Sequence, residues 1–211
     1  MRLIGMLDSP YVRRVAISLQ MLGLPFEHQP LSVFRHVEAF RQINPVIKVP
    51  TLVCDDGTVL LDSTLILEYA ETLAAPRSLK PSQPDALRRD LRLTGLALAA
   101  CEKSVQILYE HILRPAEKRH APWLERVSGQ LLAACDAMEQ ELGTRAPVMN
   151  RDTLSQGQIS AAVAWHFIQA VTADAAPAIR YPVLQAFSVE TEKLPAFQAA
   201  QHGESMCRPT G

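Results

Sequence analysis

The feature that most constrains the fold is an abrupt change of hydrophobic pattern near residues 75–85. Before this point short apolar runs alternate with helical patterns, and after it helical patterns dominate. The stretch at the change holds three prolines and no periodic pattern, which is typical of a linker. We therefore predict one domain over residues 1–75, a linker over 76–84 and a second domain over 85–211.

The first domain is predicted to be a small mixed sheet with helices packed on it. Apolar residues recur at helical spacing from Val12 to Leu22, and Asp-Asp-Gly at 55–57 separates two β-rich runs as a hairpin signal. In chain order, the predicted strands and helices cover residues 2–6, 12–22, 26–31, 36–43, 51–54, 58–61 and 62–73. The order is βαβαββα, an α/β fold in which the first two strands are parallel.

The second domain is predicted to be all-α. Its first two helices carry apolar seams with spacings of three and four residues. The predicted seams are Leu87, Leu91, Thr94, Leu98, Cys101, Val105, Leu108 and Ile112, then Leu124, Val127, Leu131, Ala134 and Met138. The spacing Ser155-x-x-Gln158 predicts a capping box at the start of a third helix.

Composition and charge exclude several classes of partner. The net charge is -1 without a basic run, which argues against nucleic acid or an anionic membrane surface as a partner. No apolar run approaches the ~18 residues that a membrane span needs. The four cysteines and six histidines show neither disulfide nor metal-ligand spacing, so we expect no metal and a reducing cytoplasmic setting.

Ser9-Pro10 lies where the first strand is followed by the first helix. Proline suits the first helical position, which makes Ser9 the N-cap. Free backbone N–H groups, the positive end of the helix dipole and a hydroxyl together favour an anion such as a thiolate. Taken alone, Ser9 is better explained as a plain helix cap.

Two further pairs are candidates for ligand contacts. Val49-Pro50 precedes a predicted strand, where a cis proline would turn the Val49 backbone outward to pair with an extended peptide. Asp62-Ser63 opens the third predicted helix and could hold a carboxylate and an ammonium group. Taken alone, the first pair is better explained as an ordinary trans proline and the second as a plain helix cap.

Three segments together resemble the glutathione S-transferase family, in particular its bacterial, serine-type members with a thioredoxin-like N-terminal domain. They are SPYVRRV, NPVIKVPTLV and LDSTLILEYAE, in that order, and the helical remainder is similar to the C-terminal domain of the family. The resemblance implies that Ser9 stabilises the thiolate of glutathione and that Val49, before a cis Pro50, pairs with its cysteinyl backbone.

The same resemblance implies roles for further residues. Asp62 and Ser63 would hold the γ-glutamyl end of glutathione and Lys48 its glycyl carboxylate, while Tyr11 and Phe34 would line a pocket for the second substrate. Glutathione would be a co-substrate, with no permanently bound cofactor, and the protein would be a homodimer. The implied activity is conjugation of glutathione to electrophilic small molecules. A glutathione-dependent isomerase or dehalogenase and a non-catalytic binding protein are the alternatives.

Some positions depart from the family pattern or stay open. The family often has Glu or Gln where this chain has Asp62, and Asp where it has Gln158. Arg13 and Arg14 are interpreted as a solvated helix face, with a place near the thiolate pocket as the alternative for one of them. Serine at position 9, where disulfide-exchanging relatives carry cysteine, excludes a mixed disulfide with the protein at that position.

Overall fold

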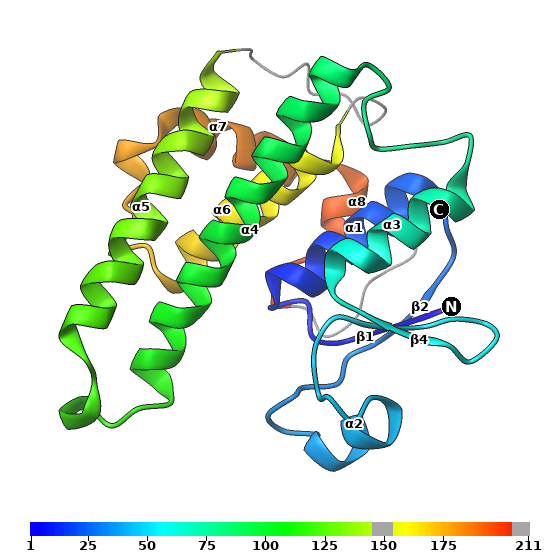
Figure 1. Ribbon diagram of the computed structural model, residues 1–211, viewed down its shortest axis with the longest axis horizontal. Coiled ribbons are helices and arrows are strands. Elements are labelled where there is room, and N and C mark those ends of the chain that lie inside the picture. The colour runs from blue at the N-terminus through cyan, green and yellow to red at the C-terminus, as the bar shows by residue number, and fades with distance from the viewer. Residues whose placement is uncertain (145–153, 204–211) are drawn as a thin grey trace. The chain divides into compact units, whose positions relative to one another are not determined.

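The computed structural model describes residues 1–144 and 154–203 of the chain (Figure 1). Two compact units are present: Met1–Leu79 together with the segment from Lys193 onward, and Lys80–Glu192. The last segment thus belongs with the first unit, whereas the sequence was interpreted as one helical domain over 85–211. Residues 145–153 and 204–211 of that range lie outside the described residues.

The first unit contains a four-stranded sheet. Its strands are β1 (Arg2–Ile4), β2 (Glu27–Gln29), β3 (Thr51–Val53) and β4 (Val59–Leu61), in the spatial order β2-β1-β3-β4. β1 and β2 are parallel, and β3 is antiparallel to both β1 and β4. The predicted parallel pair, hairpin and thioredoxin-like order βαβαββα are confirmed.

Helices cover both faces of this sheet. They are α1 (Pro10–Leu22), α2 (Val37–Ile43), α3 (Ser63–Ala74) and the short α8 (Pro195–Gln198). α1 and α3 lie side by side on one side of the sheet and α2 on the other (Figure 1). α8 packs on α1, which explains why the C-terminal segment belongs to this unit.

α1 is buried on nearly its whole circumference. Every residue except Tyr11 and Gln20 is buried, because the sheet, α3 and α8 surround it. The two arginines, interpreted from sequence as a solvated face, are only 1% (Arg13) and 2% (Arg14) exposed. A buried guanidinium requires hydrogen-bond partners, so the structure must supply them inside the unit.

His28 on β2 supports the turn that follows β1. Its Nε2 lies 2.7 Å from the carbonyl oxygen of Gly5 and donates a hydrogen bond to it. Burial lowers the pKa of His28, and the bond to Gly5 only partly opposes this effect. The imidazole is therefore neutral near pH 7 and holds the backbone at the point where the chain leaves the sheet.

The second unit consists, in its described residues, of helices and their connections. These are α4 (Pro84–Ile112), the 3-10 turn Ala116–Lys118, α5 (Ala121–Gly143), α6 (Gln156–Val171), the 3-10 turn Ala178–Arg180 and α7 (Pro182–Thr191). α4 packs against both α5 and α6, and α7 packs against α5 and α6. Across the described parts of both units, no helix is long and apolar enough to cross a membrane.

The predicted seam of α4 is partly wrong. Thr94 and Cys101 are buried as expected, but Leu91 and Ile112 are 56% and 61% exposed. The buried face instead consists of Asp90, Leu93, Thr94, Ala97, Ala100, Cys101, Ser104, Ile107 and Glu110. Because α4 has a helix on two sides, small and polar residues fill most of its contacts, and Leu93 and Ile107 are the large aliphatic residues on its buried face. On α5, by contrast, Val127, Leu131, Ala134 and Met138 are buried as predicted.

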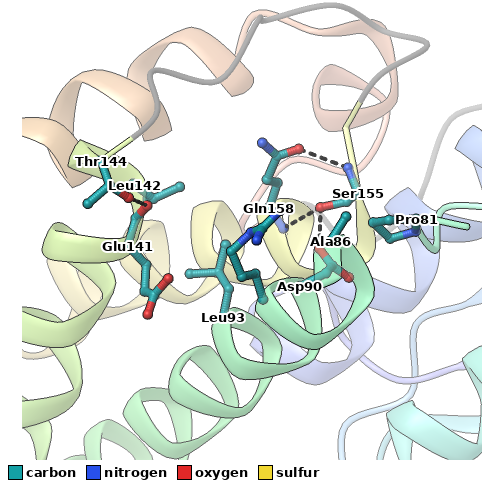
Figure 2. Close-up of a pocket in the computed structure, with 10 residues that line it drawn as sticks. Pro81, Ala86, Asp90, Leu93, Glu141, Leu142, Thr144, Ser155 and Gln158 are labelled. Carbon is teal, nitrogen blue, oxygen red and sulfur yellow. Dashed lines mark hydrogen bonds between the residues drawn. The ribbon is translucent and has the colours of Figure 1, made fainter. Parts of the chain in front are cut away.

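The start of α6 carries the predicted capping box and an additional carboxylate. Ser155 Oγ accepts from the backbone N–H of Gln158 at 3.4 Å, and the Gln158 side chain accepts from the Ser155 N–H at 2.9 Å. Asp90 on α4 accepts from the Ser155 hydroxyl (Figure 2). It also accepts from the backbone N–H of Gly157 at 3.0 Å. The charge missing at Gln158 is thus supplied by a neighbouring helix.

A pocket of about 290 Å³ lies beside this junction (Figure 2). It is lined by Pro81, Ala86, Arg89, Asp90, Leu93, Glu141, Leu142, Thr144, Ser155 and Gln158. All of these residues belong to the second unit.

We predict that Gly157→Ala lowers the free energy of unfolding by roughly 1–3 kcal/mol, because overpacking at a rigid contact has a cost of this size. A Cβ atom at this position would lie 2.6 Å from the backbone oxygen of Asp90, which cannot move without shifting α4. Gly95→Ala on α4 is the matched control, since a Cβ there meets nothing within 4 Å. This control should stabilise the protein by about 0.5–1 kcal/mol through helix propensity. Equal effects of the two substitutions in urea unfolding would contradict the prediction.

We also predict that the stability contributed by His28 is lost in mild acid. In the unfolded chain this imidazole titrates near 6.5, and in the folded protein its pKa is lower. As the pH falls from about 6.5, the unfolded chain binds a proton that the folded protein does not, so the free energy of unfolding decreases. His28→Gln should flatten this dependence in urea unfolding between pH 7.5 and 5, whereas His120→Gln, at an exposed position, should not. A stability difference between wild type and His28→Gln that is constant with pH would refute this assignment.

Candidate functional site

The strand register gathers the predicted site segments at one edge of the sheet. Ile4 at the end of β1 pairs with Thr51 at the start of β3, and Thr51 pairs with Leu61 at the end of β4. The segment after β1 leads to Ser9, the segment before β3 contains Val49 and Pro50, and the segment after β4 is Asp62-Ser63. Although these three segments are distant in sequence, the strand register places them at the same end of neighbouring strands.

Ser9 is the N-cap of α1. Its backbone is extended, with φ -74° and ψ 122°, and its Oγ accepts from the N–H of Val12 at 3.5 Å. Pro10 occupies the start of the helix, and the first turn contains no acidic residue. The positive end of α1 is therefore not neutralised by its own first turn, and the half-buried hydroxyl has its proton available to donate.

The Val49–Pro50 peptide bond is cis, as the family resemblance implied. The loop before it is held by two buried side chains. Asn44 Nδ2 donates to Thr51 Oγ1 at 2.8 Å, and the Thr51 hydroxyl donates to the carbonyl of Lys48 at 2.7 Å. Sequence reasoning missed both residues, although Asn44-Pro45 carries the turn signal of an Asn-Pro pair.

Gly5 allows this loop and the start of α1 to approach each other. Its φ is +140°, and a Cβ atom would lie 2.6 Å from Val12 Cγ2 and 2.9 Å from Val49 Cγ1. A larger residue would separate the turn that carries Val49 from the first turn of α1. Glycine is therefore required here by space as well as by backbone conformation.

Asp62 and Ser63 begin α3. Asp62 has φ 71° and ψ 124°, a conformation that is rare and strained for a residue with a side chain. Its Oδ1 accepts from the N–H of Thr64 at 2.8 Å. Ser63 is 4% exposed, and its Oγ accepts from Arg14 at 3.0 Å, which links the start of α3 to α1.

The remaining predicted residues lie in the first unit with differing exposure. Lys48 is exposed and adjoins Val49 in the loop before β3, and Tyr11 is half-buried in the first turn of α1. Phe34 is 57% exposed in the loop after β2, where its N–H donates to Ser32 Oγ at 3.2 Å. Because β2 runs parallel to β1, this loop leaves the sheet at the same edge as the turn that leads to Ser9.

Comparison with known proteins shows what the chain is similar to. Residues 3–78 match the family described as glutathione S-transferase, N-terminal domain. The uncharacterized GST-like protein YibF of Escherichia coli is 29% identical over 166 residues, covering 78% of this chain and 80% of that protein. Maleylacetoacetate isomerase of Pseudomonas aeruginosa is 30% identical over 142 residues, covering 62% of this chain and 65% of the isomerase.

A solved structure extends the similarity over most of the chain. The glutathione S-transferase of Methylobacterium radiotolerans, in complex with glutathione sulfonate, has a TM-score of 0.86 and 28% identity. The match covers 94% of this chain and 93% of that protein. The matching N-terminal sequence, the thioredoxin-like sheet and the helical second unit together give this chain the fold of a glutathione S-transferase.

Proposed function

We propose that this protein is a glutathione transferase that activates the thiol of glutathione at the start of α1 and transfers it to an electrophilic small molecule. The observation that carries the proposal is the β1-β3-β4 register, which gathers Ser9, Val49–Pro50 and Asp62–Ser63 at one sheet edge. The glutathione sulfonate bound to the Methylobacterium relative supports the same ligand class for this chain.

In the proposed complex, glutathione lies extended across this edge. The backbone of Val49 pairs with its cysteinyl residue in the manner of an added strand. The carboxylate of Asp62 receives the γ-glutamyl ammonium group, and the Ser63 hydroxyl donates to the γ-glutamyl carboxylate. The exposed ammonium of Lys48 receives the glycyl carboxylate. These contacts place the thiol beside Ser9.

Ser9 stabilises the ionised form of the thiol. Its Oγ accepts from the Val12 N–H, so its own proton is directed to the sulfur. That hydrogen bond and the positive end of α1 lower a thiol pKa that is ordinarily ~8.5. The thiol proton leaves to solvent, and the thiolate forms a carbon–sulfur bond with the electrophile. In a substitution the leaving group departs with the bonding electron pair, and in an addition the product carbon takes up a proton.

The electrophile belongs to a pocket to which Tyr11 and Phe34 contribute aromatic surface. Both side chains are uncharged and aromatic, which favours an apolar acceptor. Cytoplasmic function is consistent with Cys54, Cys101 and Cys135, which are buried and not joined in a disulfide.

A second candidate activity is cis–trans isomerisation, favoured by the 30% identity to the maleylacetoacetate isomerase. Here the thiolate adds to a conjugated double bond, rotation follows, and the thiolate leaves again, so glutathione is regenerated. Halogenated aromatics, alkyl halides and cis-enone acids assayed with glutathione distinguish the activities by their products. A protein that binds glutathione but turns over none of these would be a non-catalytic binding protein.

We predict that Ser9→Ala lowers kcat/KM for conjugation roughly 10- to 100-fold near pH 6.5, because a hydrogen bond to a charged group is worth about 1.5–3 kcal/mol. The loss should shrink as the pH approaches the pKa of the free thiol, where ionisation no longer needs assistance. Stopped-flow or steady-state assays from pH 5.5 to 9 measure this profile. Ser9→Thr keeps the hydroxyl and should retain most of the activity near pH 6.5. An unchanged profile for Ser9→Ala would exclude the proposed role.

We further propose a homodimer in which the first unit of one subunit contacts the helices of the other. On α3, Leu65, Tyr69 and Leu73 lie at four-residue intervals and are 63%, 38% and 44% exposed. On α4, Leu91 is 56% exposed. An apolar stripe of this kind on a surface helix is typical of an interaction surface.

We predict that Leu65→Glu converts the dimer to a monomer by placing a charge in this apolar stripe. Ile179→Glu is the matched control, since Ile179 is 92% exposed and is not one of the stripe residues. Sedimentation velocity should show the shift for Leu65→Glu alone. A monomeric wild-type protein, or a dimer that survives Leu65→Glu, would contradict the proposed interface.

A further inference from the structure

Arg14 is buried on α1, between the candidate thiolate site and the start of α3. Its side chain is 2% exposed, and the same terminal nitrogen donates to Ser63 Oγ at 3.0 Å and to Thr64 Oγ1 at 3.3 Å. Both acceptors lie in the first turn of α3. We propose that Arg14 is a positioning residue for glutathione, acting through Ser63 on the γ-glutamyl carboxylate. This inference rests on the proposed function, because it takes Ser63 as a glutathione contact.

The direction of the hydrogen bond between Arg14 and Ser63 determines what the Ser63 hydroxyl can do. A guanidinium has five donors and no acceptor, so Ser63 Oγ accepts from Arg14. The hydroxyl proton of Ser63 is then left to donate elsewhere, and it is polarised by the cation behind it. A hydroxyl in this state matches a carboxylate, which only accepts. Arg14 therefore makes Ser63 a hydrogen-bond donor toward the ligand, even when no ligand is bound.

The second contact, to Thr64, fixes the geometry. One nitrogen bridges the hydroxyls of two consecutive residues, so the guanidinium and the first turn of α3 are held at two points. The Ser63 rotamer is therefore set by a buried group of α1, the helix that also carries the Ser9 cap at its start. A ligand that contacts Ser9 and Ser63 together meets two groups whose separation depends on the α1–α3 packing, in which Arg14 takes part.

Arg13 shows that burial alone does not create this role. It is equally buried at 1% exposure, yet its Nε donates to the carbonyl of Ala200 at 2.7 Å and its guanidinium lies 5.7 Å from the ring centre of Phe197. Its contacts hold the C-terminal segment and α8 on α1. The two adjacent arginines therefore have different partners, and Arg13 provides a matched control for the loss of a buried guanidinium.

A double-mutant cycle measured by titration calorimetry tests the proposal. Arg14→Met, Ser63→Ala and the combined variant are titrated with glutathione, and each is first shown to be folded by circular dichroism at the assay temperature. Arg14→Met should raise the Kd roughly tenfold, the size expected for one charge-assisted contact. In the Ser63→Ala background the same substitution should raise it less than about twofold, because the path through Ser63 is already removed. Arg14→Lys, which keeps the cation and a donor, should recover part of the affinity.

The ultraviolet titration of bound glutathione supplies a readout that a general loss of structure would not give. At saturating glutathione, Arg14→Met should leave the pKa of the bound thiol unchanged, since it acts at the γ-glutamyl end. Arg13→Met should lower the melting temperature and leave the Kd within about twofold. Equal Kd increases for Arg14→Met in both backgrounds would overturn the proposal while leaving the proposed function intact. If wild-type protein fails to bind glutathione, the proposed function fails and this inference fails with it.

Discussion

The placement of β3 between β1 and β4 is the constraint on which the rest of the first unit depends. Each strand has three residues, so the pairing of Ile4 with Thr51 and of Thr51 with Leu61 has little redundancy. A slip of one residue would turn the side chains of β3 to the opposite face and move Val49 away from Ser9. Gly5 shows how closely the elements then approach, since a Cβ there would collide with Val12 and Val49. The proposed site is thus a consequence of strand register, and the hydrogen bonds of Asn44 and Thr51 hold the loop before β3.

Burial of α1 is the second constraint. A helix packed against a sheet, α3 and α8 would ordinarily be apolar on every side, but this one carries two arginines inside the unit. Desolvating a guanidinium is costly unless its donors are used, so these residues determine where neighbouring polar atoms must lie. Arg13 fixes the returning chain near Ala200, and Arg14 fixes the first turn of α3. These hydrogen bonds offset part of the cost of burial, and they orient the segments that they join.

Local patterns in the sequence were sufficient for the element order, the parallel strand pair, the hairpin at Asp55–Gly57 and the capping box at Ser155, because each depends on residues close together in the chain. Long-range packing was not accessible in this way. Arg13 and Arg14 have the composition of a solvated face, and only the return of residues 193–203 and the α3 contact explain their burial. The predicted apolar seam of α4 was partly wrong for the same reason. This helix packs between two others, so Ala97 and Ser104 are buried and Leu91 is exposed. Within the candidate site, sequence located the segments, but it did not indicate that Arg14, Asn44 and Thr51 support them.

The starts of α6 and α7 differ from the start of α1 in how their free N–H groups are satisfied. At α6, the carboxylate of Asp90 accepts from Gly157, and at α7 the carboxylate of Glu139 accepts from Val183 and Leu184 at 2.8 Å. Both positive ends are therefore neutralised by the protein itself and serve packing. α1 has the neutral Ser9 hydroxyl at its start and no acid in its first turn. A negatively charged ligand would therefore be stabilised there by the helix dipole, as the Asp90 carboxylate is at α6. α3 begins with the carboxylate of Asp62 beside the Ser63 hydroxyl and the cation of Arg14, a mixed environment that suits a group with both charges. A thiolate at one helix start and a zwitterionic γ-glutamyl group at the other is the pairing that glutathione provides.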